Sequence, residues 1–269
     1  MNNNTTNQTN NLNNNVKVSD AANAYKNMAN YNYEFIITQN RNTPKVKLVL
    51  DFKPDNFYHL SGLHDLNIKS LQSLPRTDVF NGITGGIYKD SLFQNNKDFN
   101  TIVDRIECLI RLEEMLDSND TVFKFNSHMK GTKVKCNYII KNTKDNRNYF
   151  YMISEGKDGK FFGRSCFNRD AIKQKDFSAG HAFYHTLYKA KLTVDEHGQE
   201  VDRNELFVAD SFRKELEEMK EAGEIKRLTS ALSSASSVLT NNSNNNSNNT
   251  QNFAIESPCR QQYNTLHLF

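Results

Sequence analysis

The sequence predicts an α+β protein, in which an N-terminal β-hairpin and helices pack on a C-terminal antiparallel β-meander of about four strands. Three observations favour this fold class. Apolar and polar residues alternate near the N-terminus, apolar residues recur with helical spacing in the middle, and the alternation returns toward the C-terminus. Helices followed by a run of strands are typical of α+β folds.

The N-terminal alternation predicts a hairpin. Residues 33–38 are rich in aromatic and β-branched side chains, and residues 39–44 form a polar segment that ends in Pro44. Over 45–52, apolar residues then alternate with lysines and an aspartate. We therefore expect strand 33–38 to pair with strand 45–52, with one face buried.

The middle of the chain predicts helices. Residues 57–66 carry apolar positions about three apart, which indicates a short helix or helical turn despite Gly62. Residues 67–98 contain one proline and three glycines, which favours short helices and loops. The clearest helix is predicted over about 101–116, where apolar residues share one face.

Period-two alternation returns after residue 122 and predicts the meander. The expected strands, divided by polar turns at 142–147 and 155–159, are 134–140, 149–154, 160–167 and 186–193. A charged helix with a narrow apolar stripe is expected over about 204–228.

Composition divides the chain into four expected parts. Residues 1–30 are Asn-rich and expected to be mostly disordered, 31–195 form the globular domain, 200–229 hold the charged amphipathic helix, and 230–269 form a low-complexity linker with a short tail. The helix is expected to dock on the domain or on a protein partner. The apolar end of the tail, Leu266 to Phe269, suggests docking on the domain or a partner, and an undocked tail is the alternative.

Charge and hydropathy narrow the class of protein. There are 34 Lys and Arg against 31 Asp and Glu, and a net charge of +3 permits contact with nucleic acid without implying it. No apolar run approaches the roughly 20 residues of a membrane span, and the N-terminus lacks a signal-peptide pattern. We therefore expect a soluble cytoplasmic protein with no membrane partner.

The chain carries no high-specificity cofactor or metal motif. It has no phosphate-binding glycine loop and no zinc-spaced cysteines, so we expect neither cofactor nor metal. Its four cysteines are Cys108, Cys136, Cys166 and Cys259. They include no C-x-x-C pair, which predicts reduced structural thiols rather than disulfides or zinc ligands.

Two histidines are candidates for acid–base chemistry. His59 and His64 are five residues apart, about 140° on a continuous helix, which makes a poor metal pair. One imidazole fits a general acid or base, because it titrates near neutral pH. The alternative is a histidine that caps or packs a helix.

A second candidate group lies in the predicted strand 160–167. Arg164 fits either a phosphate contact or a structural ion pair with Glu107 or Asp104. Ser165 follows it, and strand alternation places the two on opposite faces unless a bulge at Gly163 re-aims them.

Basic and aromatic residues on the other strands are candidates for substrate binding. Lys133 and Lys135 lie on one face of a predicted strand. Tyrosines of the sheet, Tyr138 among them, offer surfaces on which bases stack, although a sheet core also explains them.

Several of these segments together resemble a known family. The blocks, in chain order, are 33–37, 49–52, 57–64, 104–106, 137–140 and 164–167. Over about residues 33–192 the chain resembles the fourth group of a phage-associated branch of the Barnase–EndoU–colicin–RelE-like nucleases. The F-x-H-L-x-G-L block from Phe57 and the R-S-x-F block from Arg164 are the most specific parts.

The resemblance implies a helix-then-four-strand fold and a metal-independent ribonuclease of phage or mobile-element origin. In that chemistry a ribose 2′-hydroxyl attacks the adjacent phosphate, so the site supplies a base, an acid and a cation. By resemblance, His59 or His64 is the base or acid, Arg164 the cation and Ser165 a positioning group. We expect RNA to be bound by Lys133, Lys135, Tyr138 and Arg105.

A non-catalytic binding protein that keeps the fold is the alternative function, for example a phage-encoded inhibitor of host defence. The weak net charge and the long C-terminal helix favour it.

Overall fold

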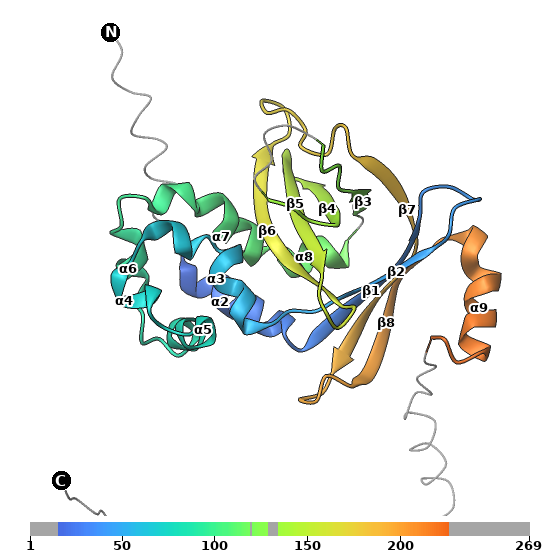
Figure 1. The fold of residues 1–269 in the computed structure, drawn as a ribbon, viewed down its shortest axis with the longest axis horizontal. Helices are drawn as coiled ribbons and strands as arrows, with labels where there is room; N and C mark the ends of the chain where they lie inside the picture. Colours follow the sequence, from blue (N-terminus) through green and yellow to red (C-terminus); the bar gives the residue numbers. More distant parts are fainter. Residues whose placement is uncertain (1–15, 119, 129–133, 226–269) are drawn as a thin grey trace, which may run out of the picture. The chain divides into compact units, whose positions relative to one another are not determined.

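The structure is a computed structural model that describes residues 16–118, 120–128 and 134–225 (Figure 1). The chain divides into a unit of residues 1–228 and a unit of residues 229–269, and every described residue belongs to the first. Lys133, Cys259, the Asn-rich tracts and the predicted linker and tail lie outside the described residues.

Helices dominate the middle of the chain, and strands the rest. The helices, with 3-10 turns labelled η, are α2 (Val18–Met28), η1 (Pro54–Asn56), α3 (Phe57–Leu60), η2 (Leu63–Leu66), α4 (Lys69–Gln72), α5 (Arg76–Thr84), α6 (Asp90–Gln94), η3 (Phe99–Thr101), α7 (Val103–Ile110), α8 (Leu112–Asp117), η4 (Asp210–Phe212) and α9 (Arg213–Glu221). The strands are β1 (Tyr31–Thr38), β2 (Val46–Leu50), β3 (Thr121–Lys124), β4 (Tyr138–Lys144), β5 (Arg147–Glu155), β6 (Phe161–Asp170), β7 (Ala182–Val194) and β8 (Glu200–Val208).

The strands form one sheet that closes on itself. Its order is β1-β2-β6-β5-β4-β3-β7-β8, and β1 also pairs with β7, so seven strands form a barrel to which β8 adds. The hairpin pairing of β1 with β2 is confirmed, with Phe35 opposite Leu48. The α+β class is confirmed, but the four-strand meander is wrong, because the hairpin joins the same sheet and β7 closes it.

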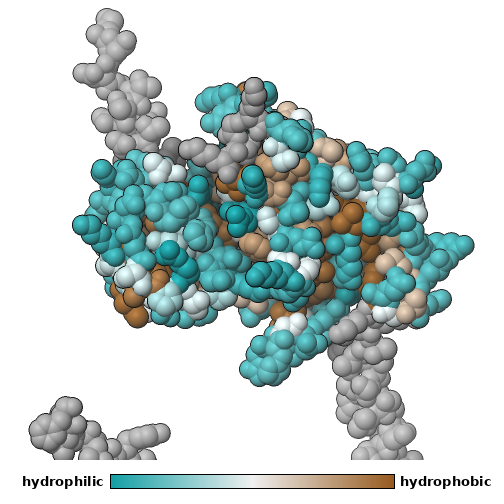
Figure 2. Space-filling view, viewed as in Figure 1, coloured by the Kyte–Doolittle hydropathy of each residue, from teal (hydrophilic) through white to brown (hydrophobic). Residues whose placement is uncertain are grey.

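The helices α2 to α7 form a layer on one side of the barrel, and α9 lies on the other side (Figure 1). Helix α2 packs against α5, α7 and α8, and its Val18, Ala21 and Tyr25 are fully buried. The packed core therefore begins at Val18, within the segment expected to be mostly disordered. Hydrophilic residues predominate on the face in view, and apolar residues show in patches over the barrel, toward α9 and at the lower edge of the helical layer (Figure 2).

The expected charged helix is partly wrong. Its first residues belong to β8, and helix α9 occupies only Arg213–Glu221. Residues 200–208 pair with β7 instead, which the periodicity of the sequence does not reveal. The guanidinium of Arg203 in β8 binds the buried carboxylate of Glu34 at 2.9 Å and the hydroxyl of Tyr188 at 3.0 Å. Helix α9 buries Leu216, next to Phe212 and the apolar residues of β7.

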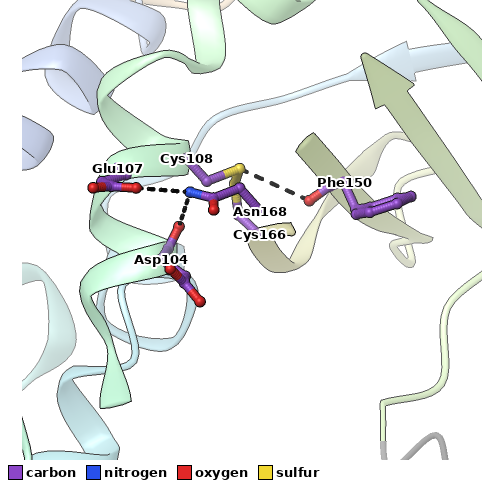
Figure 3. Close-up of a disulfide and its surroundings, with 6 residues drawn as sticks. All are labelled: Asp104, Glu107, Cys108, Phe150, Cys166 and Asn168. Carbon is purple, nitrogen blue, oxygen red and sulfur yellow. Dashed lines mark hydrogen bonds between the residues drawn. A yellow bond between two sulfur atoms is a disulfide. The ribbon is translucent and has the colours of Figure 1, made fainter. Parts of the chain in front are cut away.

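A disulfide joins the helical layer to the barrel. Cys108 in α7 and Cys166 in β6 are bonded and fully buried, so the expectation of reduced thiols is wrong for this pair (Figure 3). Sequence spacing could not reveal it, because the two cysteines lie 58 residues apart. Disulfides persist mainly in oxidising compartments. The cytoplasmic location stays a prediction, and the disulfide argues against it.

Among the described residues, no helix has the length and apolar character needed to cross a membrane.

Reduction of the disulfide should lower the free energy of unfolding by about 4 kcal/mol, because the bond closes a long loop and restricts the unfolded chain. Denaturant unfolding with and without dithiothreitol measures the change, and Cys166→Ser should reproduce it. Cys136→Ser is the control, since Cys136 is free and burial raises the pKa of its thiol to about 12. Equal stability of the oxidised and reduced protein would contradict the expectation.

Candidate active site

An open hollow of about 450 Å³ lies where α3, η2 and the start of α7 meet strand β6. We call it the histidine hollow. Among the described residues, its lining contains cationic, imidazole, amide, hydroxyl and aromatic groups but no carboxylate: Asn56, His59, His64, Arg105, Val134, Lys135, Phe162, Gly163, Arg164 and Ser165. Six of the eight site residues predicted from the sequence therefore come together in it.

A left-handed glycine brings the two histidines together. Gly62 has φ of +78° and ends the helical run after α3, before the chain re-enters a 3-10 turn at η2. The ring centroids of His59 and His64 are consequently 5.0 Å apart. The separation expected on a continuous helix is wrong, because the helix is interrupted between them.

Gly62 also lets the turn approach helix α7. A Cβ at this position would lie 2.7 Å from Cγ2 of Ile102 and 3.0 Å from Cδ of Arg105. Glycine is thus required twice, for its backbone conformation and for the space that Arg105 fills.

A β-bulge in strand β6 turns two neighbouring side chains toward the hollow. Opposite β5, Ser165 pairs with Met152 and Gly163 pairs with Ile153, which leaves Arg164 as the extra residue. Arg164 and Ser165 both line the hollow as a result.

The packing against strand β5 leaves no room for a side chain at position 163. A Cβ there would lie 2.4 Å from the hydroxyl oxygen of Tyr151, whose side chain is fully buried.

Arg164 has no ion pair among the described residues. Its guanidinium is exposed and lies 5.9 Å from the ring centroid of Phe162. The structural ion pair considered for it is not formed, because Arg147 binds Glu107 at 2.9 Å instead. The guanidinium is therefore available to an anion.

His59 favours the neutral form. Its side chain is accessible from the hollow, yet partial burial lowers its pKa, and the positive charges of His64, Arg76 and Arg164 lower it further. Arg76 lies over the ring of Tyr58 at 3.9 Å. A neutral imidazole has a free lone pair, as a general base requires.

His64 belongs to a small polar network. Its Nε2 lies 3.3 Å from Oδ1 of Asp65, whose Oδ2 lies 3.4 Å from Nη1 of Arg105. The Nδ1 of His64 is buried without a hydrogen-bond partner among the described residues. Asp65 thus links an imidazole to a guanidinium at the edge of the hollow.

Two predicted substrate-binding residues are not placed in the hollow. Tyr138 is 5% exposed and packs against Phe161, Tyr184 and the ammonium of Lys124, so the core explanation holds for it. Lys133 lies outside the described residues.

Asn56, Phe162 and Arg76 were not among the site residues predicted from the sequence. Asn56 directly precedes one of the two most specific blocks and Phe162 lies two residues before the other, and this proximity was the available signal. Arg76 acts from a helix whose position relative to His59 no local pattern reveals.

Within the described part of the chain, no three His, Cys, Asp or Glu side chains gather as ligands of a metal ion would.

These features define a class of protein: a closed β-barrel with a helical layer that presents two imidazoles and an unpaired guanidinium in one hollow. The chain belongs to the family described as phage-Barnase-EndoU-ColicinE5/D-RelE like nuclease4, whose model matches residues 17–206. The resemblance expected over 33–192 is thereby confirmed, and the match runs from α2 into β8. No curated protein and no solved structure matches the chain.

Gly62→Ala should lower the free energy of unfolding by more than the roughly 1–2 kcal/mol that a left-handed alanine costs by itself, because its Cβ also meets Ile102. Gly198→Ala is the matched control, since its φ is +72° and no atom lies within 4 Å of its Cβ. Denaturant unfolding of both variants gives the comparison. Equal losses would show that the close approach to α7 costs nothing.

Arg164→Met should raise the pKa of His59, because one of the positive charges that lower it is removed. An NMR titration of the imidazole C–H signals measures the change. Lys135→Met removes a charge from the same lining and should shift the pKa less, since Lys135 is not among the groups that act on His59. An identical shift in both variants would contradict this assignment.

Proposed function

We propose that the protein is a metal-independent ribonuclease that cleaves RNA by attack of a ribose 2′-hydroxyl on the adjacent phosphate. The observation that carries the proposal is the pair of imidazoles, 5.0 Å apart, in a hollow whose described lining holds the guanidinium of Arg164 without an ion pair and no carboxylate. This set matches the three requirements of the reaction: a base, an acid and a stabilising cation.

His59 is the proposed general base. It takes the proton of the 2′-hydroxyl while the 2′-oxygen forms a bond to phosphorus. Its lowered pKa supports this role, because the imidazole is then unprotonated at neutral pH.

His64 is the proposed general acid. It donates a proton to the 5′-oxygen as the bond from phosphorus to that oxygen breaks, which leaves a 2′,3′-cyclic phosphate and a free 5′-hydroxyl. The carboxylate of Asp65, 3.3 Å from its Nε2, is the partner for the protonated imidazole.

Arg164 and Ser165 are proposed to bind the phosphate. Negative charge grows on the non-bridging oxygens in the transition state, and a planar guanidinium binds two such oxygens. Ser165 is buried beside it and offers a hydroxyl that positions the same group. Arg105 and Lys135 extend the cationic lining to neighbouring phosphates.

The proposed substrate is RNA because the nucleophile belongs to the substrate, and DNA lacks the 2′-hydroxyl. An origin in a phage or mobile element is part of the proposal, supported by the family description.

Incubation with total RNA in EDTA should give products with cyclic phosphate ends. His59→Ala and Arg164→Ala should each lower turnover by roughly 100-fold or more, the scale of losing an acid–base group or a charge-stabilising donor. Mass spectrometry of the product ends and initial rates on one oligonucleotide measure both effects.

Arg213→Ala is the matched control, because its guanidinium binds Asp210 at 2.9 Å at the start of helix α9, away from the histidine hollow. RNA that stays intact but bound, at protein concentrations well above the binding constant, would reject the ribonuclease and support the non-catalytic binding protein.

A further inference from the structure

A second hollow continues the histidine hollow along strand β6. It has a volume of about 300 Å³ and lies at the turn between β5 and β6, so we call it the turn hollow. Asn56 and Phe162 line both hollows. The two hollows therefore adjoin, with Asn56 and Phe162 at their boundary.

The turn hollow carries two lysines without carboxylate partners. Lys53 is bound by Asp158 at 3.1 Å and by Asp51 at 3.4 Å, so these three charges leave one negative charge, and the two other lysines of the lining bring its net charge to +1. Lys157 and Lys160 make no ion pair within the described residues. Their ammonium groups are available to phosphates.

The turn that holds these lysines is itself well ordered by hydrogen bonds. The backbone N–H of Gly156 donates to the carbonyl of Lys160 at 2.7 Å, and the N–H of Lys160 donates to Oδ1 of Asp158 at 3.2 Å. Asp158 also binds Lys53, which anchors the turn to the segment before η1.

Phe162 stands at the boundary between the two hollows. It is half-buried, and the guanidinium of Arg164 lies 5.9 Å from its ring centroid. An aromatic ring beside cations is the usual combination for single-stranded nucleic acid, where a base stacks on the ring and the phosphates follow the positive charges.

We propose that the turn hollow binds the nucleotides that flank the scissile phosphate of a single-stranded RNA. The flanking base stacks on Phe162, and the next phosphates contact Lys157 and Lys160. This inference rests on the proposed function, since it assigns one direction in which the RNA leaves the histidine hollow.

The test compares 2′-O-methyl RNA of two and of six nucleotides, which cannot be cleaved by a 2′-hydroxyl. Lys157→Ala/Lys160→Ala should weaken hexamer binding about 10-fold at low salt and reduce the ratio of hexamer to dimer affinity. The slope of log affinity against log salt should fall by about 1.4, at about 0.7 per lost phosphate contact. Phe162→Leu should weaken the hexamer by roughly 5-fold to 100-fold through lost stacking.

Lys26→Ala/Lys214→Ala is the control with the same change in net charge, on helices α2 and α9. Hexamer binding that falls equally in both double variants would overturn the proposal. So would displacement of the hexamer by an acidic peptide of equal charge at the same concentration, since that would indicate a protein-binding surface.

Cleavage of unmodified RNA by the wild-type protein separates this inference from the proposed function. If RNA is cleaved while the lysine variant keeps its length dependence, the turn hollow is not the flanking site and the function stands. If no RNA is cleaved but the length dependence is lost in the lysine variant alone, the binding site stands and the function fails.

Discussion

The joint between helix α7 and strand β6 is the constraint on which the site depends. Helix α7 carries Arg105, and β6 carries Arg164 and Ser165. The disulfide joins the two elements, and next to it the amide of Asn168 donates to Glu107 at 3.0 Å and to the carbonyl of Asp104 at 3.3 Å (Figure 3). On one side strand β6 pairs with β2 in parallel through a single residue pair, and on the other it pairs with β5 along nine. The sheet thus holds β6 to β5, while the disulfide and the Asn168 contacts hold it to helix α7 beside the histidines.

Local patterns in the sequence predicted the parts of the fold that local physics decides. The hairpin followed from period-two alternation, and the two histidines were picked out from a short block of sequence. Alternation alone placed Arg164 and Ser165 on opposite faces, and the bulge that brings them to one hollow was left open. Gly62 shows where such reasoning ends. A glycine in a helical pattern is either tolerated or breaks the helix. At Gly62 the helix breaks, and the backbone comes so close to Ile102 that a Cβ would not fit. That contact joins residues distant in the chain, so the spacing of the imidazoles could not be predicted.

Closure of the barrel and pairing of the cysteines could not be predicted for the same reason. Strand β7 pairs with β1, β3 and β8, and no periodicity in 182–194 distinguishes a closing strand from the last strand of a meander. The buried ion pair of Glu34 with Arg203 joins residues 169 positions apart, and it lies in a segment that pairs with β7 as a strand where a helix was expected. Buried charges of this kind are tolerated only when paired, and the sequence does not say which residue is the partner.

The net charge of the chain does not reveal the local positive charge at the site, because most charges in this fold cancel in pairs. Glu34 is bound by both Arg203 and Lys47, and Glu107 by Arg147, so these charges contribute little to the field outside the protein. Four cations that line the two adjoining hollows make no ion pair within the described part of the chain: Lys135, Lys157, Lys160 and Arg164. A chain with a net charge of only +3 thus presents a local positive surface, which is what attracts a polyanion. Burial lowers the pKa of His59, and Arg164, one of these cations, lowers it further together with His64 and Arg76, so the guanidinium proposed to bind phosphate also favours the neutral form of the proposed base.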